Sequence, residues 1–422
     1  ADFYSHKINQ SLRFEDGDTA YLTKSTAAGN RRTFTISLWL KRGKLASQQL
    51  LVHTGDDGAN QAGLQFTNDD TLNFYSAIGG TYYQLTTTQV FRDASAWYNI
   101  VAVFDTENTT QGDRIRLYVN GVRITSFSTE TQPSQNYDSF WNQNSKGISL
   151  GVYEPNNSSL PFGGYMAEVN FIDASALDAD SFGETKAGSI WIAKDTSGLT
   201  FGTNGFRLKF QDSSALGDDT SGNGNDFTAS GLAATDVVLD SPTNNWATMN
   251  PLDGNGPTIS EGNLKVFGDT SSSVFEGFKG TFPMSSGKWY WEVNAADVNT
   301  IMQIGITPTT ATAVGSSTSL SYHTDAMVYN NAGTKAIGTG GFGTSPSSKT
   351  TTSYGNSYTD GDIIGVALDL DSSTTTLTFY KNNSSEGTAF SSLASDEYVA
   401  LYTGISNSCL LYTSDAADEW RS

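Results

Sequence analysis

The chain has 422 residues, a net charge of −20 and only 16% charged residues, against about 25% in ordinary soluble domains. So acidic a chain should repel nucleic-acid phosphates, because binding to them depends on Lys and Arg, and we expect no nucleic-acid partner. The single cysteine, Cys409, excludes a disulfide within the chain. No apolar run reaches the roughly 18 residues of a membrane span, so we expect no membrane insertion. No signal-peptide pattern opens the sequence, which starts at Ala1 and could lack its natural beginning.

Residues 1–175 contain a succession of strand patterns. Apolar residues alternate with polar ones through Ser11 to Thr23 and again through Thr33 to Arg42. A hairpin pattern runs from Trp97 to Thr106 and from Asp113 to Val122, and Asn120-Gly121 can supply the positive φ angles of a tight turn. Strands at this spacing, with no helical periodicity between them, predict a sandwich or jelly roll.

A similar hairpin pattern lies near the other end of the chain, from Asp362 to Asp371 and from Thr376 to Asn383. We therefore predict an all-β fold: two antiparallel β-sandwich (jelly-roll) domains joined by a connector that contains Gly, Asp, Asn and Pro. The only helix that the pattern favours is short, from Asp178 to Phe182. The predicted boundaries are 1–178 for the first sandwich, 179–257 for a connector packing on it, 258–408 for the second sandwich and 409–422 for a tail.

The first domain resembles a known family through the order of its motifs. These are FEDGDTAYLT, TFTISLWLKR, AWYNIVAVFD, DRIRLYVNGV and GGYMAEVNFIDASAL. In this order they resemble the concanavalin A-like jelly roll of the laminin G type, over residues 10–178. The resemblance implies two curved antiparallel sheets, a concave face, and binding of a glycan or protein through loops at one rim.

The second domain resembles the SPRY β-sandwich over residues 262–405. The motifs that carry this resemblance are SGKWYWEV, IGIT, DGDIIGVALDLDSSTTTLTFYKNN and GTAF. SPRY domains bind ligands through variable loops and are not catalysts, so the resemblance implies recognition. Residues 322–356 would form the long variable region of this domain.

The connector resembles a pattern of virion and tail-fibre-associated proteins of marine bacteriophages. The pattern consists of NGFRLKFQDSSALGDDTSGNGNDF and LDSPTNNWATMNPL, following FIDASALDADSFGE. The resemblance implies a location in the virion, a host-surface glycan or protein as partner, and contacts with other virion proteins. Fibres of this kind are often trimers, although no heptad run here supports a coiled coil.

The last residues differ in composition from the rest of the chain. CLLYTSDAADEWRS, residues 409–422, resembles the translation of sequencing-adapter DNA at the end of a metagenomic contig. We therefore expect this tail to be foreign to the natural protein. The alternative is a short frayed or helical C-terminus.

Glycan binding needs an aromatic platform beside amide and carboxylate groups that form hydrogen bonds. The loop from Asn136 to Asn144 and the segment from Val152 to Asn157 have this composition, as does the region around Tyr322 in the second domain. The alternative is that each aromatic residue fills the edge of a sandwich, since aromatic residues are mostly buried. The candidate ligand-binding residues are Tyr137, Trp141, Asn142, Tyr153, Glu154, Tyr322, Asp325 and Tyr329.

The connector also contains oxygen-bearing side chains around Gly222 and Gly224, an arrangement that suits a hard cation such as calcium. The spacing is not that of an EF-hand loop, and no Glu closes it. The favoured alternative is a cluster of Asx turns whose side chains bond to their own backbone. We expect no required cofactor, and calcium is the cation that the cluster could hold. The candidate metal ligands are Asp218, Asp219, Asn223 and Asp226.

Catalysis is an alternative to binding, because the concanavalin A-like fold also hosts retaining glycanases. Their two carboxyl groups lie about 5.5 Å apart and so share one strand face. Glu168 and Asp173 should point to opposite faces, while Asp369 and Asp371 share a face that should be solvated. No nucleophilic triad or phosphate loop is evident. We predict a non-catalytic binding protein of a phage virion, a tail fibre or appendage; the alternatives are a polysaccharide-degrading enzyme and a structural capsid or tail decoration protein.

Overall fold

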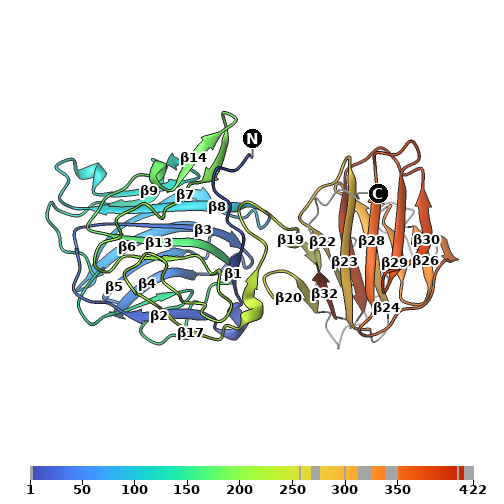
Figure 1. The fold of residues 1–422 in the computed structure, drawn as a ribbon, viewed down its shortest axis with the longest axis horizontal. Helices are drawn as coiled ribbons and strands as arrows, with labels where there is room; N and C mark the ends of the chain where they lie inside the picture. Colours follow the sequence, from blue (N-terminus) through green and yellow to red (C-terminus); the bar gives the residue numbers. More distant parts are fainter. Residues whose placement is uncertain are drawn as a thin grey trace. The chain divides into compact units, whose positions relative to one another are not determined.

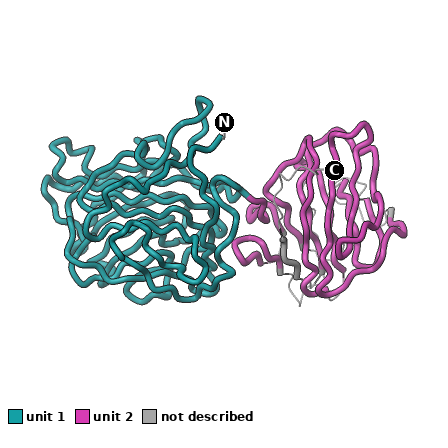
Figure 2. Tube along the Cα trace, viewed as in Figure 1, with its two compact units in different colours: residues 1–245 teal, residues 246–422 magenta. Residues whose placement is uncertain are grey.

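The computed structural model describes residues 3–255, 258–267, 276–298, 301–311, 325–337, 350–405 and 408–412. The chain forms two compact units, residues 1–245 and residues 246–422, shown in teal and magenta in Figure 2. Antiparallel sheets make up both units, and the helices of the described ranges are single 3-10 turns. The prediction of an all-β protein with two sandwiches is confirmed.

Unit 1 contains two large sheets and a separate hairpin (Figure 1). The first sheet has the order β10 (Val122–Arg123), β9 (Ile115–Val119), β8 (Trp97–Asp105), β3 (Thr33–Arg42), β13 (Gly164–Asp173), β1 (Ser11–Phe14) and β18 (Val237–Val238), with β16 (Phe206–Leu208) paired to β13. The second has the order β11 (Phe127–Thr131), β7 (Thr81–Val90), β6 (Thr71–Ile78), β5 (Asn60–Phe66), β4 (Gln49–Asp57), β12 (Gly147–Leu150), β2 (Tyr21–Ser25) and β17 (Thr228–Ser230). The hairpin is β14 (Gly183–Lys186) with β15 (Ile190–Ala193).

Alternation along the strands builds the core of unit 1. Phe34, Ile36, Leu38 and Leu40 of β3 all lie in the main apolar cluster, as their period of two predicts. The opposite face of the first sheet is also buried, because the chain after β13 folds back over it and adds Ala179, Phe182 and Phe201 to a second cluster with Val101 and Val103 of β8. Both faces of this sheet are therefore covered.

Much of the expected connector is part of unit 1. Strands β16, β17 and β18 lie within residues 179–257 and extend the two sheets of the first sandwich. The division between the units falls after Asn245, so β19 (Met249–Asn255) belongs to unit 2. The short helix expected at residues 178–182 is the 3-10 turn η3 (Ala179–Ser181).

Unit 2 is a sandwich of two seven-stranded sheets (Figure 1). One has the order β19, β22 (Glu276–Gly280), β31 (Tyr398–Ile405), β24 (Ile301–Pro308), β25 (Met327–Asn330), β26 (Thr334–Ile337) and β27 (Thr350–Ser353). The other has the order β20 (Thr258–Ser260), β21 (Lys265–Phe267), β32 (Ser408–Tyr412), β23 (Lys288–Asp297), β28 (Ile363–Asp369), β29 (Thr376–Lys381) and β30 (Ser384–Ser391).

Strand β32 bears on the expected tail. It pairs with β21 on one side and with β23 on the other, so the expected boundary at residue 408 cuts through an inner strand of the sheet. Residues 413–422 of the expected tail lie outside the described residues. The foreign origin of the tail stays a prediction.

Both predicted hairpin turns have the expected backbone. Asn120 and Gly121 have φ angles of 48° and 79°, and Asn382 and Asn383 have φ angles of 49° and 65°. Two consecutive positive φ angles match the right-handed twist of the flanking strands. In the described ranges, no helix is long and apolar enough to cross a membrane.

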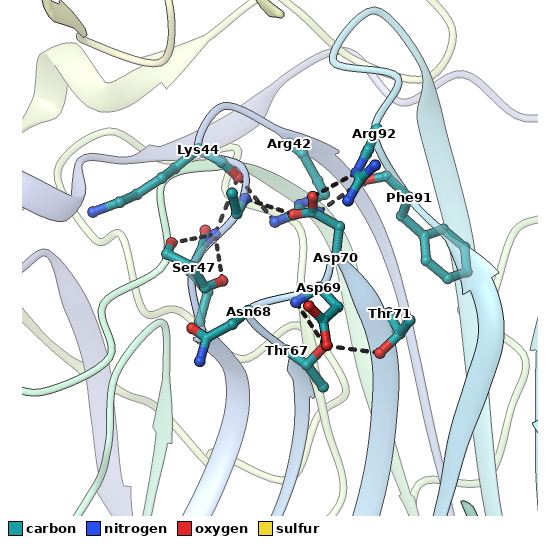
Figure 3. Close-up of polar contacts among 12 residues, drawn as sticks. Arg42, Lys44, Ser47, Thr67, Asn68, Asp69, Asp70, Thr71, Phe91 and Arg92 are labelled. Atoms are coloured by element: carbon teal, nitrogen blue, oxygen red, sulfur yellow. Dashed lines mark hydrogen bonds and ion pairs between the residues drawn. The ribbon is translucent and has the colours of Figure 1, made fainter. Parts of the chain in front are cut away.

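A buried carboxylate, Asp70, fastens one end of unit 1 (Figure 3). Its Oδ1 atom accepts hydrogen bonds from Nη1 of Arg42 at 2.9 Å and from the backbone N–H of Ala46 at 2.7 Å. Its Oδ2 atom accepts one from Nε of Arg92 at 2.8 Å. The Arg42 side chain is fully buried and also donates to the carbonyl of Phe91 at 2.7 Å. Asp70 therefore ties together the chain segments that follow β3, β5 and β7.

Another buried carboxylate, Asp173, fastens the opposite end. Asp173 is paired with Phe34 at the start of β3, whereas Arg42 is the last residue of β3. Oδ1 of Asp173 accepts from the backbone N–H of Asn30 at 2.9 Å and from Nδ2 of Asn142 at 3.0 Å. Oδ2 accepts from the backbone N–H of Asn204 at 3.1 Å. This carboxylate is held by amide groups alone.

Candidate functional site

The face of the second sheet of unit 1 that lies opposite the core carries polar and aromatic side chains, several of them buried by their neighbours. Alternate residues of β5 and β6, among them Leu64, Phe66 and Phe74, point into the core. The residues between them must point to the other face. Those residues are Gln61, Gln65, Asn73 and Tyr75, joined on β7 by Tyr82, Gln84 and Thr86. We call this set the amide–tyrosine face.

One half of the amide–tyrosine face is a ladder of amide groups across neighbouring strands. Nε2 of Gln48 donates to Oε1 of Gln65 at 2.8 Å, and Nε2 of Gln65 donates to Oδ1 of Asn73 at 2.9 Å. Nδ2 of Asn73 donates to Oγ1 of Thr86 at 2.8 Å and to Oε1 of Gln84 at 3.2 Å. These bonds orient each amide, and Gln65 and Gln84 remain partly exposed.

The other half is a cluster of aromatic rings around Gln61. Oε1 of Gln61 accepts from the Tyr75 hydroxyl at 3.2 Å and lies 3.0 Å from Nε2 of His53. Nε2 of Gln61 donates to the carbonyl of Gly58 at 2.9 Å and to the Tyr82 hydroxyl oxygen at 2.7 Å. Each donor and acceptor position of the Gln61 amide therefore has a hydrogen-bond partner.

His53 is locked in one neutral form. Its Nδ1 atom accepts the backbone N–H of Glu154 at 3.1 Å, so the ring proton must be on Nε2, which donates to Gln61. Burial lowers the pKa of His53 to about 4, against a smaller upward effect of the Gln61 hydrogen bond. The ring of Tyr153 packs on it, with 4.7 Å between the ring centroids. His53 therefore positions its neighbours without carrying charge at neutral pH.

Two glycines make room for this cluster. A Cβ atom on Gly63 would lie 2.9 Å from the hydroxyl oxygen of Tyr75, which is paired with it on the next strand. A Cβ atom on Gly147 would lie 1.7 Å from Oε1 of Glu154. Burial, with a contribution from the charge of Asp56, raises the pKa of the Glu154 carboxyl. Larger residues at either glycine would displace a side chain of the face.

The structure separates the predicted ligand-binding residues of unit 1. Tyr153 and Glu154 lie beside the amide–tyrosine face through their contacts with His53. Tyr137 is half-buried and packs on Tyr83, with 4.6 Å between the ring centroids. Trp141 is fully buried in the core.

The prediction of Trp141 and Asn142 as ligand-binding residues is therefore wrong, and both are buried as in the alternative of a filled sandwich edge. Trp141 packs against Phe34 and Phe74, and Asn142 uses its amide on the carbonyl of Asn30 and on Asp173. The physical reason is that the loop from Asn136 to Asn144 closes one end of the sandwich, where aromatic residues lose most water-exposed area.

The predicted ligand-binding residues of unit 2 do not form a described site. Tyr329 is fully buried against Tyr354, Tyr358 and Phe379, so it is a core residue and cannot contact a ligand here. Asp325 is exposed in a turn with a φ angle of 62°. Tyr322 lies outside the described residues.

The predicted metal ligands form a hydrogen-bonded loop. Oδ1 of Asp219 accepts from the backbone N–H groups of Arg207 and Ser221, both at 2.9 Å. Its Oδ2 accepts from the Ser221 hydroxyl and from the backbone N–H of Asn225, both at 2.8 Å. Oδ1 of Asp226 accepts the N–H of Asp219 at 2.9 Å. These bonds have the geometry of the Asx-turn alternative.

Other ligand groups of the same loop are also engaged. The Nδ2 group of Asn223 donates to the carbonyls of Gly202 and Gly205, at 2.7 and 2.8 Å. Asp218 is exposed at the surface. Within the described ranges, no three His, Cys, Asp or Glu side chains gather in a metal-binding arrangement. Calcium binding stays a prediction.

The carboxylates considered for glycan hydrolysis have structural partners. Glu168 is buried and forms an ion pair with Arg207, with 3.0 Å between Oε2 and Nε. Asp173 is the buried hub of the sandwich end described above. Asp369 pairs with Lys288 at 3.0 Å and accepts the Ser372 hydroxyl at 2.7 Å. None of these residues belongs to the amide–tyrosine face.

No residue of the amide–tyrosine face was among the predicted ligand-binding candidates. Its residues are Gln61, Gln65, Asn73, Tyr75, Tyr82, Gln84 and Thr86, with His53 of β4 beside them. A signal was present, because the strands Asn60–Phe66 and Thr71–Ile78 place amides and a tyrosine at every second position opposite the apolar residues.

Two antiparallel sandwiches, one of them with a polar and aromatic sheet face, define an all-β protein of two sandwich domains. The family described as Concanavalin A-like lectin/glucanases superfamily matches residues 16–181, and the family described as SPRY domain matches residues 288–411. The chain therefore carries a concanavalin A-like domain of the laminin G type followed by a SPRY domain, as the motifs predicted. No curated protein matches the chain.

Several solved structures are similar to parts of the chain. The SPRY domain of human HERC1 is 17% identical, covers 39% of this chain and 97% of its own, and has a TM-score of 0.31. Domains LG4-5 of the mouse laminin alpha1 chain are 10% identical, cover 100% of this chain and 94% of their own, and have a TM-score of 0.32. Domain 4 of AbnA, a GH43 extracellular arabinanase from Geobacillus stearothermophilus, in complex with arabinotriose, is 18% identical, covers 36% of this chain and 64% of its own, and has a TM-score of 0.28.

Proposed function

We propose that this protein is a non-catalytic binding protein that recognises a glycan through the amide–tyrosine face of unit 1. The observation that carries the proposal is the oriented amide ladder beside the tyrosine cluster. Sugar hydroxyls both donate and accept hydrogen bonds, and an amide offers both functions without charge. Aromatic rings such as Tyr82 and Tyr153 offer apolar faces for the C–H side of a sugar ring.

The charge of the face favours a neutral glycan. The ladder residues Gln48, Gln65, Asn73 and Gln84 carry no charge, and a chain with a net charge of −20 repels anionic polymers. The orientation of the amides costs little on binding, because they already hydrogen-bond to one another. We therefore expect neutral polysaccharides to bind better than sulfated or uronate-rich ones.

We also propose a biological role for this binding. The connector motifs resemble those of marine bacteriophage virion and tail-fibre-associated proteins. We assign the protein to the virion, as a tail fibre or appendage that contacts a host-surface glycan or protein. The SPRY domain would then supply a second recognition module, or a contact with other virion proteins.

A glycan array with the full chain, with and without calcium, tests the proposal. We expect binding to neutral glycans, and at least tenfold weaker binding for Gln84→Ala, which removes a partly exposed amide of the ladder. Gln89→Ala is the matched control, because Gln89 is exposed on the same strand, an odd number of residues from Gln84, and is no member of the face. Equal binding by both variants would place the glycan elsewhere.

The same preparation tests the absence of catalysis. Incubation with the polysaccharide that binds best should release no reducing ends. Their release would replace the proposed binding protein with a polysaccharide-degrading enzyme. Failure to bind any glycan, together with tight binding to purified capsids, would favour a structural decoration protein.

A further inference from the structure

A buried lysine of unit 1, Lys41, lies on β3 between two aromatic residues. It is paired with Trp97 of β8 and with Tyr165 of β13, and its Nζ atom is 5.8 Å from the centroid of the Tyr165 ring. Trp97 and Tyr165 are buried in an apolar cluster that includes Ile8 and Trp39. The Lys41 side chain is 0% exposed. Its amino group is therefore enclosed by aromatic side chains and shielded from water.

Two side chains from the segment after β18 contact this amino group. Nζ of Lys41 donates to Oδ2 of Asp240 at 2.8 Å and to Oδ1 of Asn245 at 3.0 Å. Asp240 is buried, and its Oδ1 atom accepts the indole N–H of Trp97 at 3.0 Å. Nδ2 of Asn245 donates to the carbonyl of Ser95 at 2.8 Å, which orients the amide oxygen toward Lys41. An amine, a carboxylate and a carboxamide therefore meet at one point.

These three groups have the chemistry of an amide exchange, in which an amine attacks a carboxamide and ammonia leaves. Groups held in contact in this way react as if at very high concentration, with effective molarities of about 10⁵ M or more. The amine must first lose a proton, and the nearest acceptor is Oδ2 of Asp240 at 2.8 Å. The transfer leaves a neutral amine and a neutral acid, and burial penalises neutral groups less than charged ones.

We infer that Lys41 and Asn245 join in an intramolecular isopeptide bond, with Asp240 as the proton carrier. Oδ2 of Asp240 takes a proton from the Lys41 ammonium group, and the electron pair of the neutral Nζ atom forms a bond to Cγ of Asn245. Asp240 then donates that proton to Nδ2 and takes another from Nζ, so that the Cγ–Nδ2 bond breaks and ammonia leaves. The proton left on Asp240 passes to the ammonia, and no oxidant or other reactant is needed.

The isopeptide bond links an inner strand to the last residue of unit 1. β3 is paired with β8 on one side and with β13 on the other, whereas β18 is a strand of two residues at the end of the same sheet. The chain passes from unit 1 to unit 2 after Asn245, so tension along the chain enters unit 1 at this residue. The bond transfers that tension to β3 and keeps it from separating β18 from the sheet.

Intact mass spectrometry of the denatured full chain tests the inference. The bond releases ammonia, so we expect a mass about 17 Da below the mass calculated from the sequence. A tryptic digest should contain a branched peptide that joins the segments around residues 41 and 245. Asn245→Ala and Asp240→Asn should keep the full mass, because they remove the acceptor and the proton carrier. Lys44→Arg is the matched control: Lys44 pairs with Asp16 at the surface, and the variant should still lose ammonia.

The natural chain alone decides the outcome, whether or not the variants fold. Its full mass, unchanged after incubation at neutral pH, would overturn the inference and leave the contact as an ion pair. Loss of ammonia without the branched peptide would also overturn it, because an asparagine can cyclise on its own backbone. So would a branched peptide with a loss of about 18 Da, which would join Lys41 to Asp240. Glycan binding should be equal in the natural chain and Asn245→Ala, so this inference and the proposed function can fail separately.

Discussion

The two ends of the first sandwich are fastened by buried carboxylates with different partners. Asp70 is held by two arginines and one backbone N–H, while Asp173 is held by two backbone N–H groups and one asparagine amide. Both side chains occupy loop junctions next to the ends of β3. The difference shows that one fold can hold the loops at its ends either with ion pairs or with neutral hydrogen-bond donors. The stability of the two ends should therefore respond differently to the same substitution.

The largest effect is expected from Asp70→Asn. Asn accepts the φ angle of 61° at this position, so the substitution does not strain the backbone. It removes the charge and replaces one of the two accepting oxygens with an NH₂ group. It leaves the fully buried Arg42 without its counter-ion, and breaking a buried pair in this way costs about 3 to 5 kcal/mol. Urea denaturation at neutral pH measures the change in the free energy of unfolding. A loss below about 1 kcal/mol would mean that Arg42 finds another partner.

A smaller effect is expected from Asp173→Asn. The oxygen of the new amide can still accept from Asn30 or Asn142, but its NH₂ group would face the backbone N–H of Asn204. One buried donor is then unsatisfied, at a cost of about 1 to 3 kcal/mol. The same denaturation experiment makes the comparison direct. If Asp173→Asn costs more than Asp70→Asn, the contrast between charged and neutral ends is wrong.

Arg92→Gln should have a still smaller effect. The Arg92 side chain is 52% exposed, whereas its partner Asp70 is 1% exposed. Solvent screening reduces the contribution of such a pair to about 0.2 to 1 kcal/mol. Thermal melts compare the loss of stability in Arg92→Gln with that in Arg32→Gln, whose ion pair with Asp138 is exposed on both sides. If the two melting temperatures fall equally, the ion pair with Arg92 adds no more than an exposed pair, and Asp70 depends on Arg42 alone.

The last prediction concerns how the stability difference between the natural chain and Asp70→Asn changes with pH. Burial alone would raise the pKa of Asp70, but hydrogen bonds from Arg92 and Ala46 and the charge of Arg42 lower it below its usual value. A carboxyl with a lowered pKa contributes stability above its unfolded pKa of about 3.9 and loses that contribution as the pH falls through its folded pKa. The stability gap between the natural chain and Asp70→Asn should therefore narrow below about pH 4. A constant gap down to acid unfolding would contradict this.

Local patterns predicted the strands and turns because they depend on neighbouring residues. The period of two in Thr33–Arg42 places Phe34 to Leu40 in the core, and Asn120-Gly121 forms the turn that its φ preferences allow. The motif order identified both domain families. What the patterns could not predict is how loops distant in sequence meet.

The candidate site shows this limit. Tyr153 and Glu154 were predicted, but their partner His53 is a hundred residues earlier in the chain, and only the fold brings them together. Trp141 was a ligand-binding candidate because aromatic and amide side chains share its loop, while the structure buries it against Phe34 and Phe74, as in the alternative of a filled sandwich edge. The pairing of Asp70 with Arg92 and of Asp173 with Asn204 likewise depends on sheet order.

Strand β32 has a consequence for any shortened form of the chain. Because β32 lies between β21 and β23, it is the described link that attaches β20 and β21 to the rest of their sheet. A chain ended at residue 405 would leave β23 and β21 each with an unpaired edge of backbone N–H and C=O groups. Such edges pair readily with other molecules, so the shortened protein should self-associate while its first sandwich remains folded.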